Sequence, residues 1–210
     1  MKKVIVTAFD PFGGETVNPA LVAVMALPDT IEGVQIIKQE LPTVYGKNFD
    51  VLLPVLEQEK PDAVISVGQA GGRSNFSIER VAINIDDAKM ADNDGIVLTD
   101  RTIVQGAPAA YFSTLPIKVI IEDLHHAQIP ASVSNTAGTF VCNHIMYTTL
   151  HYALVHKLKM QVGFIHVPYL PVQTLTKPSA PSMSLENMTR GLETIIRTVG
   201  HVRQTERDVQ

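Results

Sequence analysis

The 210-residue sequence is 45% hydrophobic and 18% charged, so it can bury a large core. Its net charge of −4 argues against a basic surface for nucleic acid or anionic membranes, and its one cysteine excludes an internal disulfide. The apolar run after Lys3 ends at Asp10, which is too short for a signal peptide, and no run approaches the roughly 18 residues of a membrane span. We therefore expect a cytoplasmic protein that binds neither nucleic acid nor membranes.

Apolar, β-rich runs alternate with amphipathic segments along the chain. The β-rich runs predict strands at residues 3–9, 34–41, 63–68, 76–84, 131–133 and 161–167. Helical spacing of apolar side chains predicts helices at residues 18–27, 45–60, 116–127, 142–157 and 184–198, the last capped by Ser184. This alternation predicts an α/β fold with a largely parallel mixed sheet. We expect one domain over residues 1–210, ending in a polar tail at about 201–210.

Cys142 stands out because it is the only cysteine and opens a predicted helix. A lone cysteine is more often a small buried hydrophobic residue. At a helix N-terminus, however, unpaired N–H groups and the helix dipole favour the thiolate. Ligands of α/β sheets gather at the carboxyl ends of strands. The segments that follow predicted strands, at residues 9–19, 68–75, 134–142 and 166–171, therefore predict the site.

His166 is the best partner for Cys142 among seven histidines, because it alone ends an apolar strand. His144 is two residues from Cys142, and residues so spaced on a helix point about 200° apart. A third group usually orients the imidazole of a Cys–His pair. Glu79 is the candidate, since strand alternation places it on the face of apolar side chains, where a carboxylate needs a partner. The pattern leaves two partners equally open for Glu79: a histidine, or a cation such as Arg73.

The glycine-rich stretches at residues 12–15 and 68–73 match neither phosphate-binding motif, although their N–H groups could form an oxyanion hole. Asp86, Asp87, Asp92 and Asp94 fit no calcium loop and predict a solvated turn, and the histidines show no zinc motif. We expect no metal and no cofactor.

Four blocks carry a family resemblance: TAFDPFGG at residues 7–14, GQAGGR at 68–73 with IERVAIN at 78–84, SNTAGTFVCN at 134–143 and FIHVPYL at 164–170. Together they resemble the pyroglutamyl-peptidase type I family of cysteine exopeptidases, also called pyrrolidone-carboxylate peptidases, over nearly the whole chain. The resemblance implies a three-layer α/β/α sandwich, usually a homotetramer. It also implies hydrolysis of an N-terminal pyroglutamyl residue from peptides.

Carried over by position, the resemblance implies that Cys142 is the nucleophile, His166 the base and Glu79 the third member of a triad. It places the pyroglutamyl pocket at Phe9, Phe12, Gln69, Phe140 and Val141. A flat, uncharged lactam suits aromatic faces, whereas a free α-ammonium group would have to be desolvated. Family members commonly carry arginine and isoleucine where this chain has Lys89 and Met90, which we expect to affect rate and subsite detail rather than the reaction.

Two other functions remain compatible with the residues: a nucleoside phosphorylase-like transferase on a similar sheet, and a non-catalytic binding protein. Prolines at 168, 171, 178 and 181 predict a long stiff loop after the histidine strand, which is either a lid or a subunit contact.

Overall fold

A seven-stranded sheet lies at the centre of the computed structural model, which describes residues 1–201. The remaining residues of the expected polar tail lie outside the described part. The strand order is β2-β3-β1-β4-β9-β5-β8. The bounds are β1 Lys2–Phe9, β2 Thr30–Ile31, β3 Val34–Leu41, β4 Ala63–Gln69, β5 Phe76–Glu79, β8 Ala131–Ser134 and β9 Gln161–Val167.

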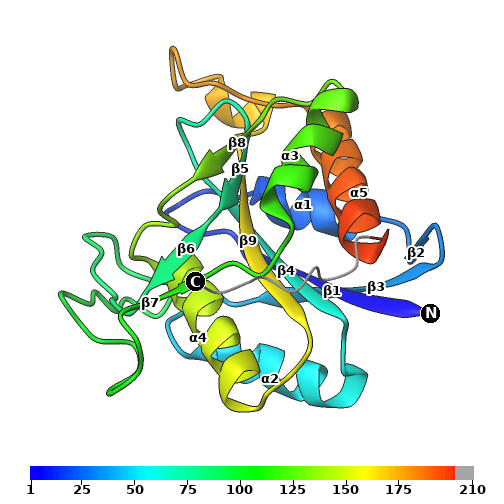
Figure 1. Cartoon of the computed structure of the whole chain (residues 1–210). Helices are drawn as coiled ribbons and strands as arrows, with labels where there is room; N and C mark the ends of the chain where they lie inside the picture. Colours follow the sequence, from blue (N-terminus) through cyan, green and yellow to red (C-terminus); the bar gives the residue numbers. More distant parts are fainter. Residues whose placement is uncertain (202–210) are drawn as a thin grey trace.

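Helices cover both faces of this sheet, which confirms the expected three-layer α/β/α sandwich (Figure 1). On one face, Val4 and Val6 of β1 pack with α1 (Pro19–Met25), α3 (Ile117–His126) and α5 (Leu185–His201). On the other, Ile5 and Phe9 pack with α2 (Lys47–Glu59) and α4 (Val141–Val155). Successive side chains of a strand point to opposite faces, so one apolar strand contributes side chains to both cores. Within residues 1–201 no helix is both long enough and apolar enough to cross a membrane.

The sheet is mixed, because β5 pairs antiparallel with β9 while β8 pairs parallel with β5. Strands β1, β3, β4 and β9 run together, as predicted, but β5 and β8 run the other way. We expected Cys142 and His166 to lie together because both follow strands that end at the same edge of the sheet. That reason is wrong, since β8 runs opposite to β9. The chain after β8 instead crosses over, and α4 begins beside the end of β9.

The single strand predicted at residues 76–84 is wrong, since the chain leaves the central sheet at Arg80. Its second half, β6 (Val81–Ile83), forms a separate two-stranded sheet with β7 (Ala110–Phe112) beside α4 (Figure 1). The backbone of Arg80 marks the break, because its N–H donates to Ser134 and its carbonyl accepts from Ser113. Glu79 thus does not share an apolar face with Val81 and Ile83.

The helix ends follow local capping chemistry. The side chain of Asn18 accepts from the N–H of Ala20 at 3.0 Å, and the predicted cap Ser184 accepts from Asn187 at 3.2 Å.

The expected solvated turn of aspartates is wrong for Asp86 and Asp92, which are buried. Asp92 accepts the N–H groups of Asp94 and Ile96, which offsets the cost of burying its charge.

Candidate active site

The imidazole of His166 lies near the carboxyl end of β9, where the residue is 5% exposed. Its register partners are Gly68 on β4 and Ser77 on β5. Because residues directly opposite in a sheet point to one face, the imidazole lies on the α2–α4 side, with the ring of Phe164 at 4.8 Å between centroids. The sheet thus presents His166 on one defined face.

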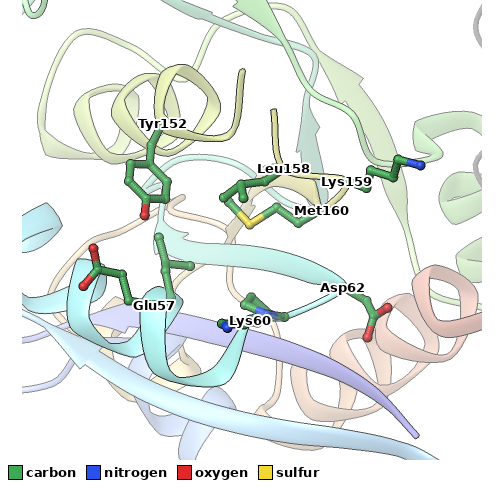
Figure 2. A pocket seen from close by; sticks show the side chains of 9 residues that line it. Glu57, Lys60, Asp62, Tyr152, Leu158, Lys159 and Met160 are labelled. Carbon is green, nitrogen blue, oxygen red and sulfur yellow. The ribbon is translucent and has the colours of Figure 1, made fainter. Parts of the chain in front are cut away.

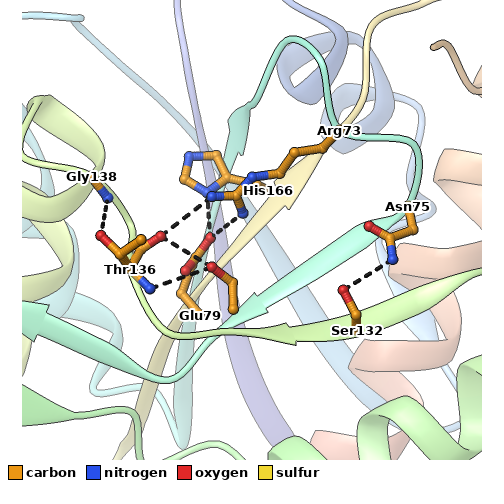
Figure 3. Close-up of polar contacts among 8 residues, drawn as sticks. Arg73, Asn75, Glu79, Ser132, Thr136, Gly138 and His166 are labelled. Carbon is orange, nitrogen blue, oxygen red and sulfur yellow. Dashed lines mark hydrogen bonds and ion pairs between the residues drawn. The ribbon is translucent and has the colours of Figure 1, made fainter.

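One carboxylate oxygen of Glu79 binds both of the partners that the sequence left open. Its Oε1 atom accepts from His166 Nδ1 at 2.7 Å and from Arg73 Nη1 at 2.7 Å, and the Glu79 side chain is fully buried (Figure 3). The guanidinium also donates to the carbonyl of Thr136 at 3.3 Å. Arg73 therefore compensates a buried charge that would otherwise be costly, while the carboxylate orients the imidazole. With Nδ1 donating to Glu79, Nε2 of a neutral His166 is an acceptor.

Cys142 lies directly over Gly68. A Cβ atom built on Gly68 would be 3.1 Å from Cys142 Sγ and 2.7 Å from the Phe164 ring. Gly68 is in register with His166 on the adjacent strand, and adjacent strands lie about 4.8 Å apart. The sulfur and the imidazole therefore share one face, and only glycine at position 68 leaves room for the thiol.

Cys142 is the second residue of α4, as the sequence predicted to within one position. The first N–H groups of the helix have no intrahelical acceptor, so they surround the thiol with donors. Burial nevertheless raises the pKa of the Cys142 thiol to about 12, and the negative charge of Glu79 acts in the same direction. Arg73 opposes this rise without cancelling it. Burial and Glu79 thus favour the thiol over the thiolate that the helix start alone would favour.

His144 forms a different pair and is not a partner of Cys142. Its Nδ1 atom lies 2.8 Å from Asp86 Oδ2, and its Nε2 atom accepts from the N–H of Gly46 at 3.3 Å. Since a backbone N–H can only donate, the proton of neutral His144 is on Nδ1. These two contacts anchor the start of α4 to Asp86 and to the segment before α2.

An aromatic cluster lies beside the start of α4. The rings of Phe12 and Phe140 are 6.3 Å apart, and Tyr45 meets Phe140 edge-on at 5.5 Å. Phe12 and Phe140 are half-buried. The sequence pattern missed Tyr45, although it follows β3 and the strand-end rule would have found it had that segment been included. Burial raises the pKa of its hydroxyl, which therefore remains a hydrogen-bond donor.

The other expected pocket residues are placed less directly. Phe9 and Val141 are each 1% exposed, and Phe9 packs against Phe164 at 6.4 Å between centroids. Met90 is 44% exposed, with its sulfur 3.4 Å from where a Cβ of Gly13 would lie. Lys89 is exposed, and Gln69 bonds to Gln173 rather than to Cys142 or His166.

A cavity of about 520 Å³ lies elsewhere, between the ends of α2 and α4 and the starts of β4 and β9 (Figure 2). It is lined by Leu56, Tyr152, Leu158, Met160 and charged side chains that include Lys60 and Asp62. None of the expected site residues contributes to it, so it is separate from the Cys142 site.

Comparisons with known proteins identify the family that the chain matches. A family model described as pyroglutamyl peptidase matches residues 2–202. Pyrrolidone-carboxylate peptidase 2 of Caldanaerobacter subterraneus subsp. tengcongensis is 53% identical over 198 residues, which cover 94% of this chain and 96% of that protein. The Streptococcus suis pyrrolidone-carboxylate peptidase is 52% identical over 204 residues, covering 97% and 95%.

Solved structures show the same similarity in three dimensions. The pyroglutamyl peptidase I of Bacillus amyloliquefaciens superposes with a TM-score of 0.93 at 46% identity, covering 96% of each chain. The pyrrolidone carboxyl peptidase of Pyrococcus furiosus gives a TM-score of 0.91 at 45% identity, covering 94% of this chain and 97% of that one.

Proposed function

The chain belongs to the pyroglutamyl peptidase family of cysteine peptidases, and we propose on this basis that Cys142, His166 and Glu79 are its catalytic residues. The reaction is hydrolysis of the bond that follows an N-terminal pyroglutamyl residue. One observation carries the assignment of residues: the Glu79–His166 bond of 2.7 Å, on the face where Cys142 Sγ lies over Gly68.

The resting thiol determines how the first step proceeds. Because burial raises the pKa of Cys142 to about 12, the thiol loses its proton only when a base removes it. Nε2 of His166 takes that proton as Sγ forms a bond to the pyroglutamyl carbonyl carbon. Glu79 holds the imidazole in the required tautomer and stabilises the imidazolium that results.

The later steps use the same imidazole. The carbonyl oxygen becomes an oxyanion, and the N–H groups at the start of α4 and in the glycine loop (residues 69–73) stabilise it. The imidazolium then protonates the leaving amine, the C–N bond breaks and a thioester on Cys142 remains. His166 removes a proton from water, whose oxygen attacks the thioester and releases pyroglutamate and the thiol.

The substrate pocket that we propose consists of Phe9, Phe12, Gln69, Lys89, Met90, Phe140 and Val141. The half-buried rings of Phe12 and Phe140 provide the faces for the lactam, with Phe9 and Val141 supporting them from the core. Gln69 contributes through its backbone, while Met90 and the exposed Lys89 form the rim. A protonated amino terminus would lose its hydration against these rings without gaining a partner, which favours pyroglutamyl peptides over ordinary ones.

Replacement of the nucleophile tests the assignment. We expect Cys142→Ala to lose turnover of a pyroglutamyl arylamide in phosphate-free buffer, and iodoacetamide to inactivate the unmodified enzyme. A matched variant, Ser132→Ala, changes an exposed side chain on β8 and should keep full activity. Activity in Cys142→Ala at the level of the unmodified enzyme would disprove the nucleophile. Family membership already decides against the phosphorylase and the binding protein.

We also infer a homotetramer. The small sheet of β6 and β7 exposes Phe112 (64%) and Ile83 (36%) on its outer face, and a subunit contact would remove these apolar side chains from water. Light scattering should give four chain masses, and Phe112→Ser should lower that mass. A monomeric mass for the unmodified enzyme would exclude the tetramer.

A cytoplasmic location fits the chemistry, because the proposed mechanism requires a reduced thiol at Cys142 and reducing compartments preserve it. We further propose that residues 1–210 form one catalytic domain. Both cores pack against one sheet, so limited proteolysis should not divide the described part into stable fragments.

A further inference from the structure

Gln173 is a buried amide outside the triad that joins three loops. It lies in η1 (Pro171–Thr174), the short 3-10 helix after β9, and is 7% exposed. Its Oε1 accepts from the N–H of Leu170 at 3.0 Å. Its Nε2 donates to Gln69 Oε1 at 3.0 Å and to the carbonyl of Val17 at 3.2 Å, and lies 3.4 Å from Glu15 Oε2. One side chain thus connects the segments that leave β1, β4 and β9.

The orientation of these amides follows from backbone chemistry. The N–H of Leu170 can only donate and the carbonyl of Val17 can only accept, so the oxygen of Gln173 faces Leu170 and its nitrogen faces Val17. The same nitrogen then requires an acceptor from Gln69, which must present its oxygen. Gln173 therefore fixes the side chain of Gln69.

The side chain of Gln69 points away from the proposed nucleophile. Gly68 faces Cys142, so strand alternation directs Gln69 to the opposite face, where Val17 packs against the core beneath α1. The amide of Gln69 consequently anchors the glycine loop, and the backbone of that loop is the part that faces the substrate.

The end of β9 and the segment after it hold the glycine loop at further points. The N–H of Ala70 donates to Val167 at 2.9 Å, and a Cβ on Gly71 would be 2.2 Å from Tyr169 Oη, so the tyrosine lies directly on that glycine. Lys177 Nζ pairs with Glu15 Oε1 at 2.7 Å and lies 5.1 Å from the Tyr169 ring centroid. The segment after β9 is therefore packed against the glycine loop and does not form an open lid.

From these contacts we propose that Gln173 is a positioning residue that holds the glycine loop in the geometry that binds the pyroglutamyl residue. The inference rests on the proposed function, because it assigns the loop backbone to substrate binding. Gln173 touches neither the triad nor the substrate and acts through Gln69. Its loss should weaken substrate binding while leaving the chemistry of Cys142 intact.

Kinetics of Gln173→Met test this role, because methionine keeps the length of the side chain but removes its hydrogen bonds. We expect KM for a pyroglutamyl arylamide to rise about tenfold or more with kcat within about threefold. The rate of Cys142 alkylation by iodoacetamide should stay unchanged. Gln173→Glu should raise KM further, since a carboxylate cannot donate to Val17 or Gln69 and faces Glu15. Gln58→Met, at an exposed glutamine of α2, is the matched control.

A second variant approaches the same bond from the other side. Gln69→Met should reproduce the rise in KM, and Gln69→Met combined with Gln173→Met should not exceed the Gln173→Met variant. An unchanged KM in both single variants, a loss confined to kcat with slower alkylation, or additive increases in KM would each overturn the inference. The proposed function is tested by a different variant, because activity retained by Cys142→Ala would disprove it whatever the Gln173 variants show.

Discussion

Glu79 holds the imidazole of His166 with the same oxygen that pairs with Arg73, and both contacts are 2.7 Å long. The imidazole is thereby oriented by a carboxylate whose charge is already compensated. This arrangement differs from an isolated Glu–His pair, because two donors share one acceptor atom. Removing either the charge or the cation should therefore have distinct effects.

Glu79→Gln removes the charge and keeps the shape. The amide oxygen can still accept from Nδ1, but it cannot stabilise the imidazolium, so kcat/KM should fall about 10²- to 10⁴-fold. Steady-state kinetics with a pyroglutamyl arylamide measure the loss. Glu59→Gln, which changes a carboxylate at the end of α2 that pairs with Lys3 at the start of β1, is the control and should retain its activity. Equal activity of the two variants would exclude Glu79 from the triad.

Arg73→Met tests the cation. Glu79 would keep a buried charge with His166 as its remaining partner, and we expect the free energy of unfolding to fall by about 1–3 kcal/mol. Urea denaturation measures this change. In the control Arg197→Met, the lost partner is the exposed Glu32, so the change should be about 0.5 kcal/mol or less. A loss for Arg73→Met no larger than that of the control would show that the guanidinium does not compensate Glu79.

Much of the central sheet could be predicted because a buried strand is visible in the sequence as a run of apolar residues. Strands β1, β4 and β9 are nearly continuous apolar runs, and their observed ends lie within one residue of those predicted. The direction of β5 and β8 could not be predicted in this way, because the direction of a strand depends on which strands it pairs with. The break at Arg80 also lacked a signal, since alternation continues through it and only the contacts with Ser113 and Ser134 redirect the chain.

Some features of the site could likewise be predicted from single segments of the sequence, and others could not. Cys142 and His166 were predicted from a helix start and a strand end, which are properties of one segment each. The choice of partner for Glu79 was undecidable from spacing, because Arg73 and His166 approach it from different elements. The helix start, which is visible in the sequence, favours the thiolate, whereas burial and Glu79 raise the pKa of the thiol, and burial depends on surrounding segments.

Gly68→Ala tests the space beneath the thiol. The new Cβ would be 3.1 Å from Cys142 Sγ and 2.7 Å from Phe164, so the sulfur must move. We expect kcat/KM to fall about 100-fold, since a displacement of about 1 Å at a nucleophile has such effects.

Gly163→Ala is the matched control, because its Cβ would meet Leu115 at 2.5 Å among core residues of the other face. Both variants should lose about 1–3 kcal/mol of stability through overpacking. The activity of the folded control should persist, and a similar loss of activity in both variants would contradict the assigned position of Cys142.

The raised pKa of Cys142 predicts a stability change at alkaline pH. An unfolded cysteine ionises near pH 8.5, whereas the folded thiol stays protonated to about pH 12. Between these values the unfolded state binds fewer protons, so the free energy of unfolding falls as pH rises, by about 1.4 kcal/mol per pH unit from this group alone. Below pH 8.5 the group should have no effect on the pH dependence.

Denaturation of the unmodified enzyme and of Cys142→Ala from pH 7 to pH 11 isolates this contribution, because other groups titrate equally in both. The difference in unfolding free energy should be constant up to about pH 8.5 and then decline steadily. Parallel curves throughout would mean that the folded thiol ionises as readily as the unfolded one. Burial would then not stabilise the protonated thiol, and a thiolate would form without His166 above about pH 8.5.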